Sequence, residues 1–445
     1  MTAAFQTFGC KLNQYETEAL ASEFRNRGFS LVASDQPADV YVINTCTVTS
    51  KSEQKARRLI RKISREHPGS LLVVTGCYAQ LNAGDLAALG NNVQVVSQEQ
   101  KTSLMELPRL LRKRGAAAYS AGDLQRSVAS AESGEHAQSD PFAYRVDRFS
   151  YHSRAFLKVQ DGCDYRCAYC RVPLARGRSV SLDPQEAVQQ AQEIERRGYR
   201  EVVLTGVNLT AYRCGDTELP ALLEKILVNS ERLRLRLSSL EPERVNKELS
   251  DVLRSPRICP HFHLPIQSGS DPVLLRMRRR YRSERVVQAV RLLRTVKEDP
   301  FLAADIIVGF PGEGEQDFQA TRRLIESLGL SKLHVFPFSP RPGTAAEHAS
   351  DPVAERIRDR RVHELLSLSR ELHEAYIERW IGRQVEIVLE KDGRAAGGSW
   401  KGLSGNYLKV LVEGVPGEAG GAGKLVQVLI EELGDPCRCR FVGTA

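Results

Sequence analysis

Residues 162–170 read Gly-Cys-Asp-Tyr-Arg-Cys-Ala-Tyr-Cys and are the most informative stretch of the sequence. Its three cysteines, Cys163, Cys167 and Cys170, stand in a CxxxCxxC spacing, with Tyr169 directly before the last one. Three closely spaced thiolates can ligate three irons of a 4Fe-4S cluster and leave the fourth iron open to a substrate. The stretch therefore predicts a reaction centre rather than a site that only passes electrons.

The same three cysteines also allow two simpler interpretations. They could bind zinc together with a distant cysteine or histidine, or they could be buried thiols that pack as small hydrophobic side chains. Zinc sites usually pair two CxxC hooks, and this sequence has no such pair. The spacing therefore favours a cluster.

The composition is that of an ordinary globular protein. Of the 445 residues, 42% are hydrophobic and 27% are charged, and the length is enough for about three domains. No stretch approaches the ~20 apolar residues of a membrane span, and the first residues lack a signal-peptide pattern, so we expect a cytoplasmic protein without a membrane partner. In that reducing compartment the ten cysteines are expected to be metal ligands or reactive thiols rather than disulfides. The net charge of +8 suits a polyanionic partner.

Short apolar runs alternate with helix-periodic stretches over residues 1–112, which predicts a doubly wound parallel α/β domain. The expected strands are residues 5–8, 40–43 and 71–74, and the expected helices include 17–27 and 54–65. A cysteine follows each strand: Cys10, Cys46 and Cys77. Because open α/β sheets build their sites at the carboxyl ends of strands, we expect these cysteines to converge. Isolated core cysteines are the alternative.

Residues 113–148 are rich in Ala, Ser, Gly and charge, and we expect them to form a linker. A central domain of residues 149–380 then repeats a unit of strand, loop and helix. Its expected strands are residues 155–159, 201–204, 233–237, 261–264, 303–308 and 332–336, and its expected helices include 184–197 and 283–296. Six such units predict a partial (βα)6 barrel with its chemistry on the loops that follow the strands.

The last domain, residues 381–445, has apolar or alternating runs at 385–390, 406–412 and 424–430, separated by glycine-rich turns. This pattern predicts a small antiparallel β-barrel of OB-like size, a fold that often binds nucleic acid. The candidate RNA contacts in it are Lys401, Tyr407 and Lys409. A purely structural barrel is the alternative.

With these three modules in this order, the chain resembles the radical S-adenosylmethionine methylthiotransferases over nearly its whole length. Three stretches most resemble the branch that modifies N6-threonylcarbamoyladenosine at position 37 of tRNA: 7–18 (TFGCKLNQYETE), 44–49 (NTCTVT) and 74–80 (VTGCYAQ). The branches that act on isopentenyladenosine in tRNA or on a ribosomal-protein aspartate differ mainly around Cys10, and they are the sibling alternatives. Leu174 departs from the pattern, since an aromatic residue is common there. Four further cysteines have no assigned role: Cys214, Cys259, Cys437 and Cys439.

The resemblance implies a reaction with two 4Fe-4S clusters and with S-adenosylmethionine as radical source and methyl donor. The cysteines that match the ligands of the S-adenosylmethionine cluster are Cys163, Cys167 and Cys170, and those that match an auxiliary cluster are Cys10, Cys46 and Cys77. Sulfur would be inserted at C2 of the adenine and then methylated. The implied partners are tRNA, a sulfur donor that the sequence does not identify, and an electron donor of flavodoxin or ferredoxin type. The C-terminal barrel would be a TRAM domain.

The candidate contacts of S-adenosylmethionine lie on the loops of the central domain, where glycine and polar residues let backbone approach a ligand. They are Tyr169, Gly206, Asn208, Ser238, Glu241, Gln267, Gly309 and Gly312, with Arg176 as a candidate partner of a carboxylate.

The basic run 276–282 supplies further candidate RNA contacts: Arg276, Arg278, Arg279 and Arg280. A solvated helix face is the alternative for this run. His261 and His263 are expected to be core or rim residues rather than metal ligands. Outside the family, the rival function is a zinc-stabilised RNA-binding protein without catalysis.

Overall fold

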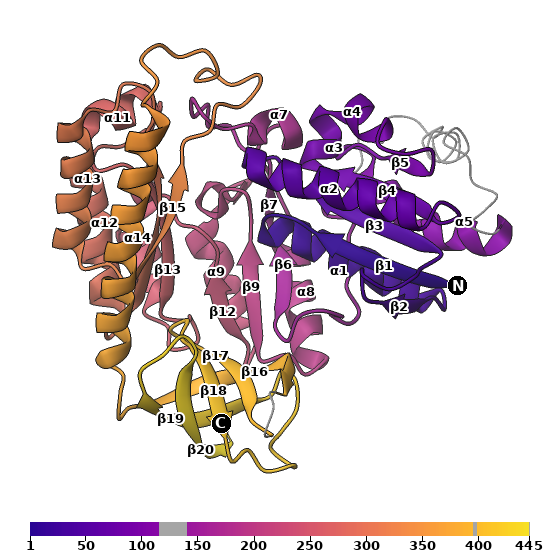
Figure 1. Ribbon diagram of the computed structural model, residues 1–445. Helices are drawn as coiled ribbons and strands as arrows, with labels where there is room; N and C mark the ends of the chain where they lie inside the picture. The colour runs from indigo at the N-terminus through magenta and orange to yellow at the C-terminus, as the bar shows by residue number, and fades with distance from the viewer. Residues whose placement is uncertain (115–139, 395–397, 445) are drawn as a thin grey trace.

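The structure is a computed structural model that describes residues 1–114, 140–394 and 398–444. Three bodies follow one another along the chain (Figure 1): an N-terminal α/β domain, a central barrel of strands and helices, and a small closed β-barrel below the central one. The predicted α/β multidomain fold is therefore confirmed. None of the described helices is long and apolar enough to cross a membrane.

The N-terminal domain is a five-stranded parallel sheet in the order β2-β1-β3-β4-β5. Its strands are β1 (Thr2–Thr7), β2 (Ser30–Val32), β3 (Val40–Thr45), β4 (Leu71–Gly76) and β5 (Val93–Val95). Its helices are α1 (Lys11–Asn26), α2 (Ser50–Glu66), α3 (Cys77–Leu81), α4 (Ala83–Ala87), the 3-10 helix η1 (Lys101–Met105) and α5 (Leu107–Arg114). Strands β3 and β4 are buried throughout, as expected for the apolar runs of a parallel sheet, and each face of the sheet has its own core.

The central barrel consists of two three-stranded parallel sheets, in the orders β12-β9-β6 and β13-β14-β15. The strands are β6 (Ala155–Lys158), β9 (Glu201–Thr205), β12 (Arg234–Leu237), β13 (His261–Gln267), β14 (Phe301–Val308) and β15 (Lys332–Pro337). An isolated bridge between Ser239 and His263 connects the two sheets. The predicted partial barrel of six strands is confirmed, and within the described ranges its edge strands β6 and β15 do not pair with each other.

Helices cover the outside of the central barrel. The main ones are α8 (Pro184–Arg196), α9 (Leu219–Val228), α10 (Lys247–Leu253), α12 (Ser283–Val296), α13 (Glu315–Leu328) and α14 (Glu355–Glu378). Short elements lie in the connecting loops: β7 (Gln160–Asp161), α7 (Val172–Arg176), β8 (Val180–Ser181), η3 (Leu209–Ala211), β10 (Arg213–Cys214), β11 (Thr217–Glu218), η4 (Pro242–Arg244) and α11 (Asp271–Arg276). The N-terminal domain packs on the open side of the barrel, where α1 lies next to β6 (Figure 1).

The expected linker 113–148 is described only in part, and its Ala-rich and Ser-rich stretches at 116–122 and 127–133 lie outside the described residues. Its last part differs from the expectation, because Phe142 and Tyr144 are buried in the core of the central domain. Tyr144 packs edge-on against Tyr15 of α1, with ring centroids 6.5 Å apart. Two aromatic side chains therefore fix an otherwise polar segment between α1 and the barrel.

The C-terminal barrel is closed, with the strand order β16-β17-β18-β20-β19. Its strands are β16 (Gln384–Arg394), β17 (Trp400–Ser404), β18 (Lys409–Glu413), β19 (Leu425–Glu432) and β20 (Cys437–Thr444). The predicted small β-barrel is confirmed, but it is not antiparallel throughout, since β18 and β20 pair in parallel. A closed ring with an odd number of strands cannot alternate direction at every step, so one parallel pair is required.

The C-terminal barrel closes the base of the central barrel, where the amino ends of the central strands lie. The Tyr407 ring stacks on His261 with a centroid distance of 4.0 Å. Arg236 donates to the carbonyl oxygens of Ser404 and Gly405 at 2.9 and 3.0 Å. The expectation that Tyr407 contacts RNA is corrected here, because its ring lies in the seam between the two barrels.

Candidate functional site

Cys10, Cys46 and Cys77 lie just after the carboxyl ends of β1, β3 and β4. Gly9 packs so closely on Cys46 that a Cβ atom at Gly9 would lie 2.6 Å from Cys46 Sγ, and its φ of 97° favours glycine. Burial, followed by the charges of Cys10 and Cys77, raises the pKa of Cys46 to about 12. Burial also raises the pKa of Cys77. Cys10 and Cys77 are therefore close enough to Cys46 for their charges to act on it.

The CxxxCxxC stretch forms a loop in which every cysteine sulfur accepts a hydrogen bond. The donors are Tyr165 N to Cys163 Sγ at 3.4 Å, Arg279 Nη1 to Cys167 Sγ at 3.3 Å, and Val172 N to Cys170 Sγ at 3.4 Å. Burial raises the pKa of Cys163 to about 11 and that of Cys170 to about 12. Hydrogen bonds to ligand sulfurs are among the means by which proteins tune iron-sulfur clusters, so the loop fits such a group.

In the part of the chain that the structure describes, neither cysteine set is arranged around a single metal ion. A zinc ion needs its ligand atoms to converge on one point, and no group of three Cys, His, Asp or Glu side chains in the described part of the chain does so. A cubane makes no such demand, because each cysteine ligates a different iron.

Arg176 joins the two cysteine sets. It stands at the end of α7, shortly after the CxxxCxxC loop, and its side chain is only 2% exposed. Its Nε donates to Cys77 Sγ at 3.3 Å, and its Nη1 donates to Glu16 Oε1 at 2.9 Å and to Asp161 at 3.0 Å. Its Nη2 donates to Asn13 Oδ1 at 2.7 Å. The expectation that Arg176 binds a ligand carboxylate is corrected, because all three of its nitrogens already donate to protein atoms.

Glu16 is the centre of a buried ion cluster that the sequence did not predict. Its carboxylate pairs with Lys101, with Lys158 at 3.0 Å and with Arg176 at 2.9 Å. Asp161, which pairs with Arg176 at 3.0 Å and also with Lys158, completes the cluster. Burial alone would raise the pKa of Glu16, but the three cations hold it well below its ordinary value. Because these residues come from α1, η1, β6, β7 and α7, the cluster fixes the N-terminal domain on the barrel.

Glu53 accepts a second group of hydrogen bonds that connects the surroundings of the two cysteine sets. It accepts hydrogen bonds from Arg171, the residue after the CxxxCxxC stretch, at 3.2 Å and from Arg341 of the loop after β15. Thr47, the residue after Cys46, accepts from the same two guanidinium groups at 3.0 and 3.2 Å. Burial lowers the pKa of Arg171. Neighbours of both cysteine sets thus meet at one buried carboxylate.

Several expected contacts of S-adenosylmethionine lie together at the carboxyl ends of β9 and β12. Asn208 and Ser238 are buried, and within the described ranges Asn208 Nδ2, Ser238 Oγ and the nearby Thr205 Oγ1 have no hydrogen-bond partner. Gly206 lies beside them, where a Cβ atom would stand 2.8 Å from Gln160 Oε1. Since buried polar atoms are normally hydrogen-bonded, this cradle fits a polar ligand such as S-adenosylmethionine.

Other expected contacts of this ligand are placed differently. Arg358 fills the space where a Cβ atom of Gly309 would stand, and Arg276 lies against Gly312. Gln267 is buried at the end of β13 with a φ of 67°. The structure therefore brings Gly206, Asn208 and Ser238 into one cradle but covers the two glycines with arginine side chains.

Glu241 and Arg279 form a buried pair beside Cys167. Arg279 donates through Nη2 to Glu241 and through Nη1 to Cys167. Burial raises the pKa of Glu241 to about 7, although Arg279 opposes this shift. Burial also raises the pKa of Tyr169 well above its ordinary value. The expectation that Arg279 contacts RNA is wrong, because its guanidinium is buried against a cysteine of the loop and a carboxylate.

The remaining expected RNA contacts are exposed: Arg276, Arg278, Arg280, Lys401 and Lys409. The Arg280 guanidinium covers the Tyr165 ring at 4.0 Å. Lys409 lies 3.6 Å from Asp435. Exposure leaves these cations accessible to phosphate, as it does any solvated basic face.

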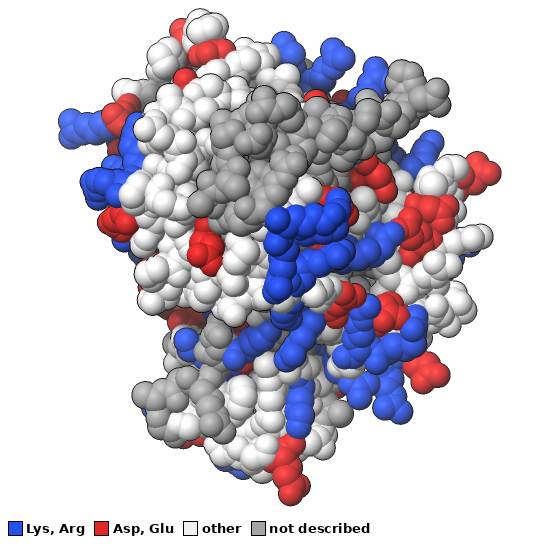
Figure 2. Space-filling model, turned by 90° about the vertical axis from the view of Figure 1, so that its right-hand side faces the viewer, with Lys and Arg blue, Asp and Glu red and all other residues white. Residues whose placement is uncertain are grey.

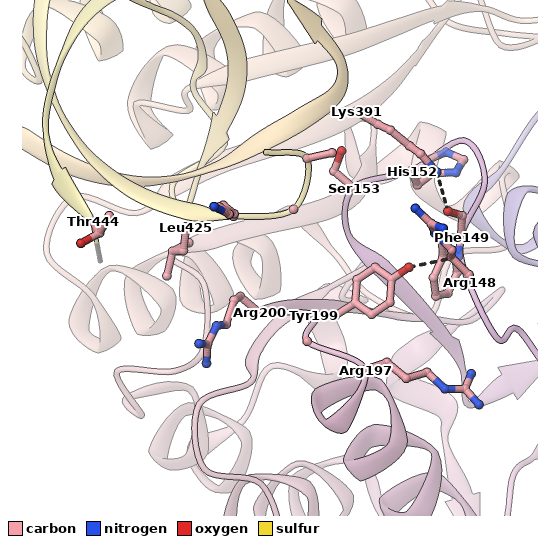
Figure 3. A pocket seen from close by; sticks show the side chains of 14 residues that line it. Arg148, Phe149, His152, Ser153, Arg197, Tyr199, Arg200, Lys391, Leu425 and Thr444 are labelled. Atoms are coloured by element: carbon pink, nitrogen blue, oxygen red, sulfur yellow. Dashed lines mark hydrogen bonds between the residues drawn. The ribbon is translucent and has the colours of Figure 1, made fainter. Parts of the chain in front are cut away.

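A basic pocket that the sequence did not predict lies at the opposite end of the central strands, next to the C-terminal barrel (Figure 3). It has a volume of about 470 Å³, and Phe149 and Tyr199 form an aromatic wall in which Phe149 N donates to Tyr199 Oη at 3.1 Å. Its basic side chains are Arg148, His152, Arg197, Arg200, Lys391 and Lys424. Figure 2 shows Lys and Arg gathered over the middle of the face that includes the N-terminal domain. The pocket is therefore suited to an anion rather than to the chemistry at the cysteines.

Two family models match the chain: Uncharacterized protein family UPF0004 over residues 2–97 and the Radical SAM superfamily over residues 157–325. The chain is 41% identical to the threonylcarbamoyladenosine tRNA methylthiotransferase MtaB of Treponema pallidum (strain Nichols), over 96% of this chain and 98% of that protein. It is 36% identical to the protein of the same name from Bacillus subtilis (strain 168), over 98% and 95%.

Among solved structures, the chain is similar to the radical S-adenosylmethionine methyltransferase TsrM from Kitasatospora setae. The TM-score is 0.55 at 16% identity, and the match covers 78% of this chain and 75% of that one. This similarity concerns the fold. On the sequence matches, the chain belongs to the radical S-adenosylmethionine methylthiotransferase family, as a tRNA-modifying enzyme that uses S-adenosylmethionine and a 4Fe-4S cluster.

Proposed function

We propose that the enzyme inserts sulfur at C2 of N6-threonylcarbamoyladenosine at position 37 of tRNA and methylates it, giving 2-methylthio-N6-threonylcarbamoyladenosine. The names of the relatives support this acceptor. The observation that carries the proposal is the hydrogen bond by which Arg176, in the helix after the CxxxCxxC loop, donates to Cys77 of the other cysteine set. A site built in this way can apply both kinds of cluster chemistry to one bound base.

The loop cysteines Cys163 and Cys170, with Cys167 between them, would hold the cluster whose open iron binds S-adenosylmethionine. When bound, this pair of groups supplies a radical that removes hydrogen from an unactivated carbon, a step that no acid or base side chain performs. The protein contributes donors to each sulfur and a cradle of unpartnered atoms, Asn208 Nδ2 and Ser238 Oγ, for the polar parts of the ligand. These groups would hold S-adenosylmethionine in a fixed orientation.

Cys10, Cys46 and Cys77 would hold a second 4Fe-4S cluster with one open iron, the place from which sulfur reaches the base. Cys46 and Cys77 are buried, which limits contact of water with that group. The positive Arg176 guanidinium and its hydrogen bond to Cys77 Sγ would stabilise the negative charge that a reduced cluster carries. The chain therefore offers a tuned pocket for an auxiliary cluster.

The three domains would divide this work. Residues 1–112 carry the auxiliary cluster, residues 149–380 the radical chemistry and residues 381–445 a TRAM-like RNA-binding barrel, with 113–148 as the connection. The basic pocket beside the C-terminal barrel supports a path for tRNA phosphates across this end of the molecule. Action on tRNA implies a cytoplasmic location.

The proposal is tested with anaerobically reconstituted protein, S-adenosylmethionine, a reductant and two purified tRNAs that differ at position 37. One carries threonylcarbamoyladenosine and the other isopentenyladenosine. Mass spectrometry of the nucleosides should find the methylthio product only from the first tRNA. Product from the isopentenyladenosine tRNA alone would assign the enzyme to the sibling branch and overturn the proposed acceptor.

A further inference from the structure

The inner face of the central barrel is layered. Strand register places Asp305 of β14 beside His334 of β15 and Ile307 beside Phe336, and His263 of β13 lies on the same face. The alternate residues of β14 pack in the apolar core on the other side of the sheet. His263, Asp305 and Ile307 are only partly buried, and His334 and Phe336 are exposed, so solvent reaches this inner face, the lumen of the barrel.

Polarity changes along this lumen. The base is closed by the stacking of His261 on Tyr407. Above it is a polar layer in which Ser239 Oγ lies 2.7 Å from His263 Nδ1, and His263 Nε2 lies 2.9 Å from Asp305 Oδ1. Nearest the carboxyl ends of the strands, toward the cysteines, come Ile307 and Phe336. An apolar layer near the cysteines and a polar layer below it would suit a base that carries a polar tail.

Lys11 reaches toward this lumen from the N-terminal domain. It is the first residue of α1 and shares a helix face with Tyr15 and Ala19, which pack in the core of the central domain. Burial, followed by Arg236 and Arg154, lowers the pKa of Lys11 to about 8, whereas Glu201 and Asp305 oppose the shift. Burial and neighbouring charges that include Lys11 lower the pKa of His334. The Lys11 ammonium therefore lies within electrostatic range of the polar layer.

No counter-charge is in contact with this cation, although Glu201 and Asp305 are close enough to act on its pKa. Across residues 1–114, 140–394 and 398–444, the Lys11 ammonium has no hydrogen bond or ion pair. Asp305 contacts His263 at 2.9 Å, and Glu201 is paired with Arg234 and Arg236. A partly buried cation without a partner favours an anionic group on the ligand.

The proposed acceptor has such a group. On the adenine ring, N1 separates C2 from C6, the carbon that carries N6, so the bonds at C2 and at C6 point in different directions. A base that directs C2 toward the cysteines therefore directs its N6 substituent to another part of the site. The threonylcarbamoyl substituent carries a hydroxyl and ends in a carboxylate. We propose that the polar layer of the lumen binds this substituent and that the Lys11 ammonium pairs with its carboxylate.

This inference rests on the proposed acceptor and makes Lys11 a specificity-determining residue. An isopentenyl substituent is apolar and would leave the Lys11 ammonium without a counter-charge in a desolvated place. Leaving a buried charge unpaired disfavours the wrong ligand, so one lysine can both select the acidic substituent and reject the apolar one.

The test measures binding of reconstituted protein to anticodon stem-loop RNAs that differ only at position 37: threonylcarbamoyladenosine, its methyl ester, and unmodified adenosine. Wild type should bind the acid roughly 10- to 100-fold more tightly than the ester, the range expected for a hydrogen bond to a charged group. Lys11→Gln should bind acid and ester equally, and Lys11→Arg should restore part of the preference. Lys55→Gln, which removes an exposed charge from α2 of the same domain, is the matched control and should keep the wild-type preference. All variants are compared at equal iron and sulfide content.

The outcomes separate the two proposals. If wild type neither prefers threonylcarbamoyladenosine over adenosine nor forms product from it, the proposed acceptor is wrong. If wild type prefers threonylcarbamoyladenosine over adenosine but binds the acid and the ester equally, no cation binds the carboxylate. The assignment of Lys11 is then wrong, while the proposed acceptor stands. The same conclusion follows if Lys11→Gln keeps the full preference for the acid.

Discussion

Replacing Glu16 by glutamine removes the carboxylate that three buried cations share. Lys101, Lys158 and Arg176 would then have only Asp161, which contacts two of them, so the net charge of the cluster rises from one positive charge to two. Glutamine has nearly the same shape as glutamate. The effect of Glu16→Gln is therefore electrostatic and does not arise from a cavity.

The size of the effect follows from burial. Removing one partner of a buried ion pair costs about 3–5 kcal/mol, because the remaining charge is left uncompensated. The Glu16 side chain is 0% exposed, so solvent screening does not reduce this cost. For a cooperative unit of roughly 150–250 residues, the melting temperature should fall by about 6–20 °C.

The assay is scanning calorimetry of the apoprotein, with Glu23→Gln as the control. Glu23, on the same helix as Glu16, pairs at 2.7 Å with the exposed Arg27 that follows the helix, so loss of the Glu23 carboxylate should leave the melting temperature nearly unchanged. Glu16→Gln should also lower the iron bound after reconstitution, because the ion cluster fixes the helix that begins next to Cys10. If Glu16→Gln melts like Glu23→Gln, the ion cluster does not hold the two domains together and the reasoning is refuted.

The pH dependence of this stabilisation has a defined sign. The pKa of Glu16 is held well below its ordinary value in the folded protein, so its stabilising effect is present above the unfolded pKa of about 4.3. It is lost as the pH falls toward the folded pKa. Glu16→Gln should therefore flatten the low-pH part of the stability profile.

Three further predictions concern the cysteines, the Glu241 pair and the basic pocket. Cys167→Ala should abolish cleavage of S-adenosylmethionine. Cys46→Ala should leave this cleavage measurable but stop formation of the methylthio product. Normal product formation by Cys46→Ala would contradict the auxiliary-cluster role. Burial raises the folded pKa of Glu241 to about 7, above its unfolded value of about 4.3, so the stability of the apoprotein should fall as pH rises between these values. Glu241→Gln should flatten that slope in melting curves at several pH values, and an unchanged slope would disprove the assignment. Replacing Arg200 and Lys424 by glutamate should weaken tRNA binding. The slope of log K against log salt concentration should fall by about 1 for each phosphate that the variant no longer binds. An unchanged slope would show that the pocket does not bind tRNA phosphates.

The elements that the sequence predicted well are those with a local signal. Strand β3 contains the expected run 40–43, and a buried apolar run that ends in Asn-Thr-Cys also locates Cys46 at the strand end. The same pattern located Cys10 and Cys77. These positions follow from chain geometry, because a residue after a parallel strand must lie at the carboxyl edge of its sheet.

The contacts that the sequence did not predict depend on residues far apart in the chain. Arg176 lies close to the loop cysteines in sequence, but its partner Glu16 is 160 residues away, and no local pattern indicates that pairing. The other arginines in the basic run 276–282 are exposed, and only the fold shows that Arg279 pairs with Glu241. A weak signal existed for the ion cluster, since Lys158 ends an otherwise apolar strand.

The seam between the two barrels limits how the parts of this enzyme can be exchanged during evolution. Phe301 and Tyr376 of the central domain belong to the same apolar core as the C-terminal barrel, and Arg236 has two of its hydrogen-bond acceptors on that barrel. Replacing residues 381–445 with an unrelated RNA-binding domain would expose this core and leave the buried Arg236 without those acceptors. It would also remove the floor of the barrel interior, so the C-terminal barrel and the catalytic barrel must be inherited as one unit.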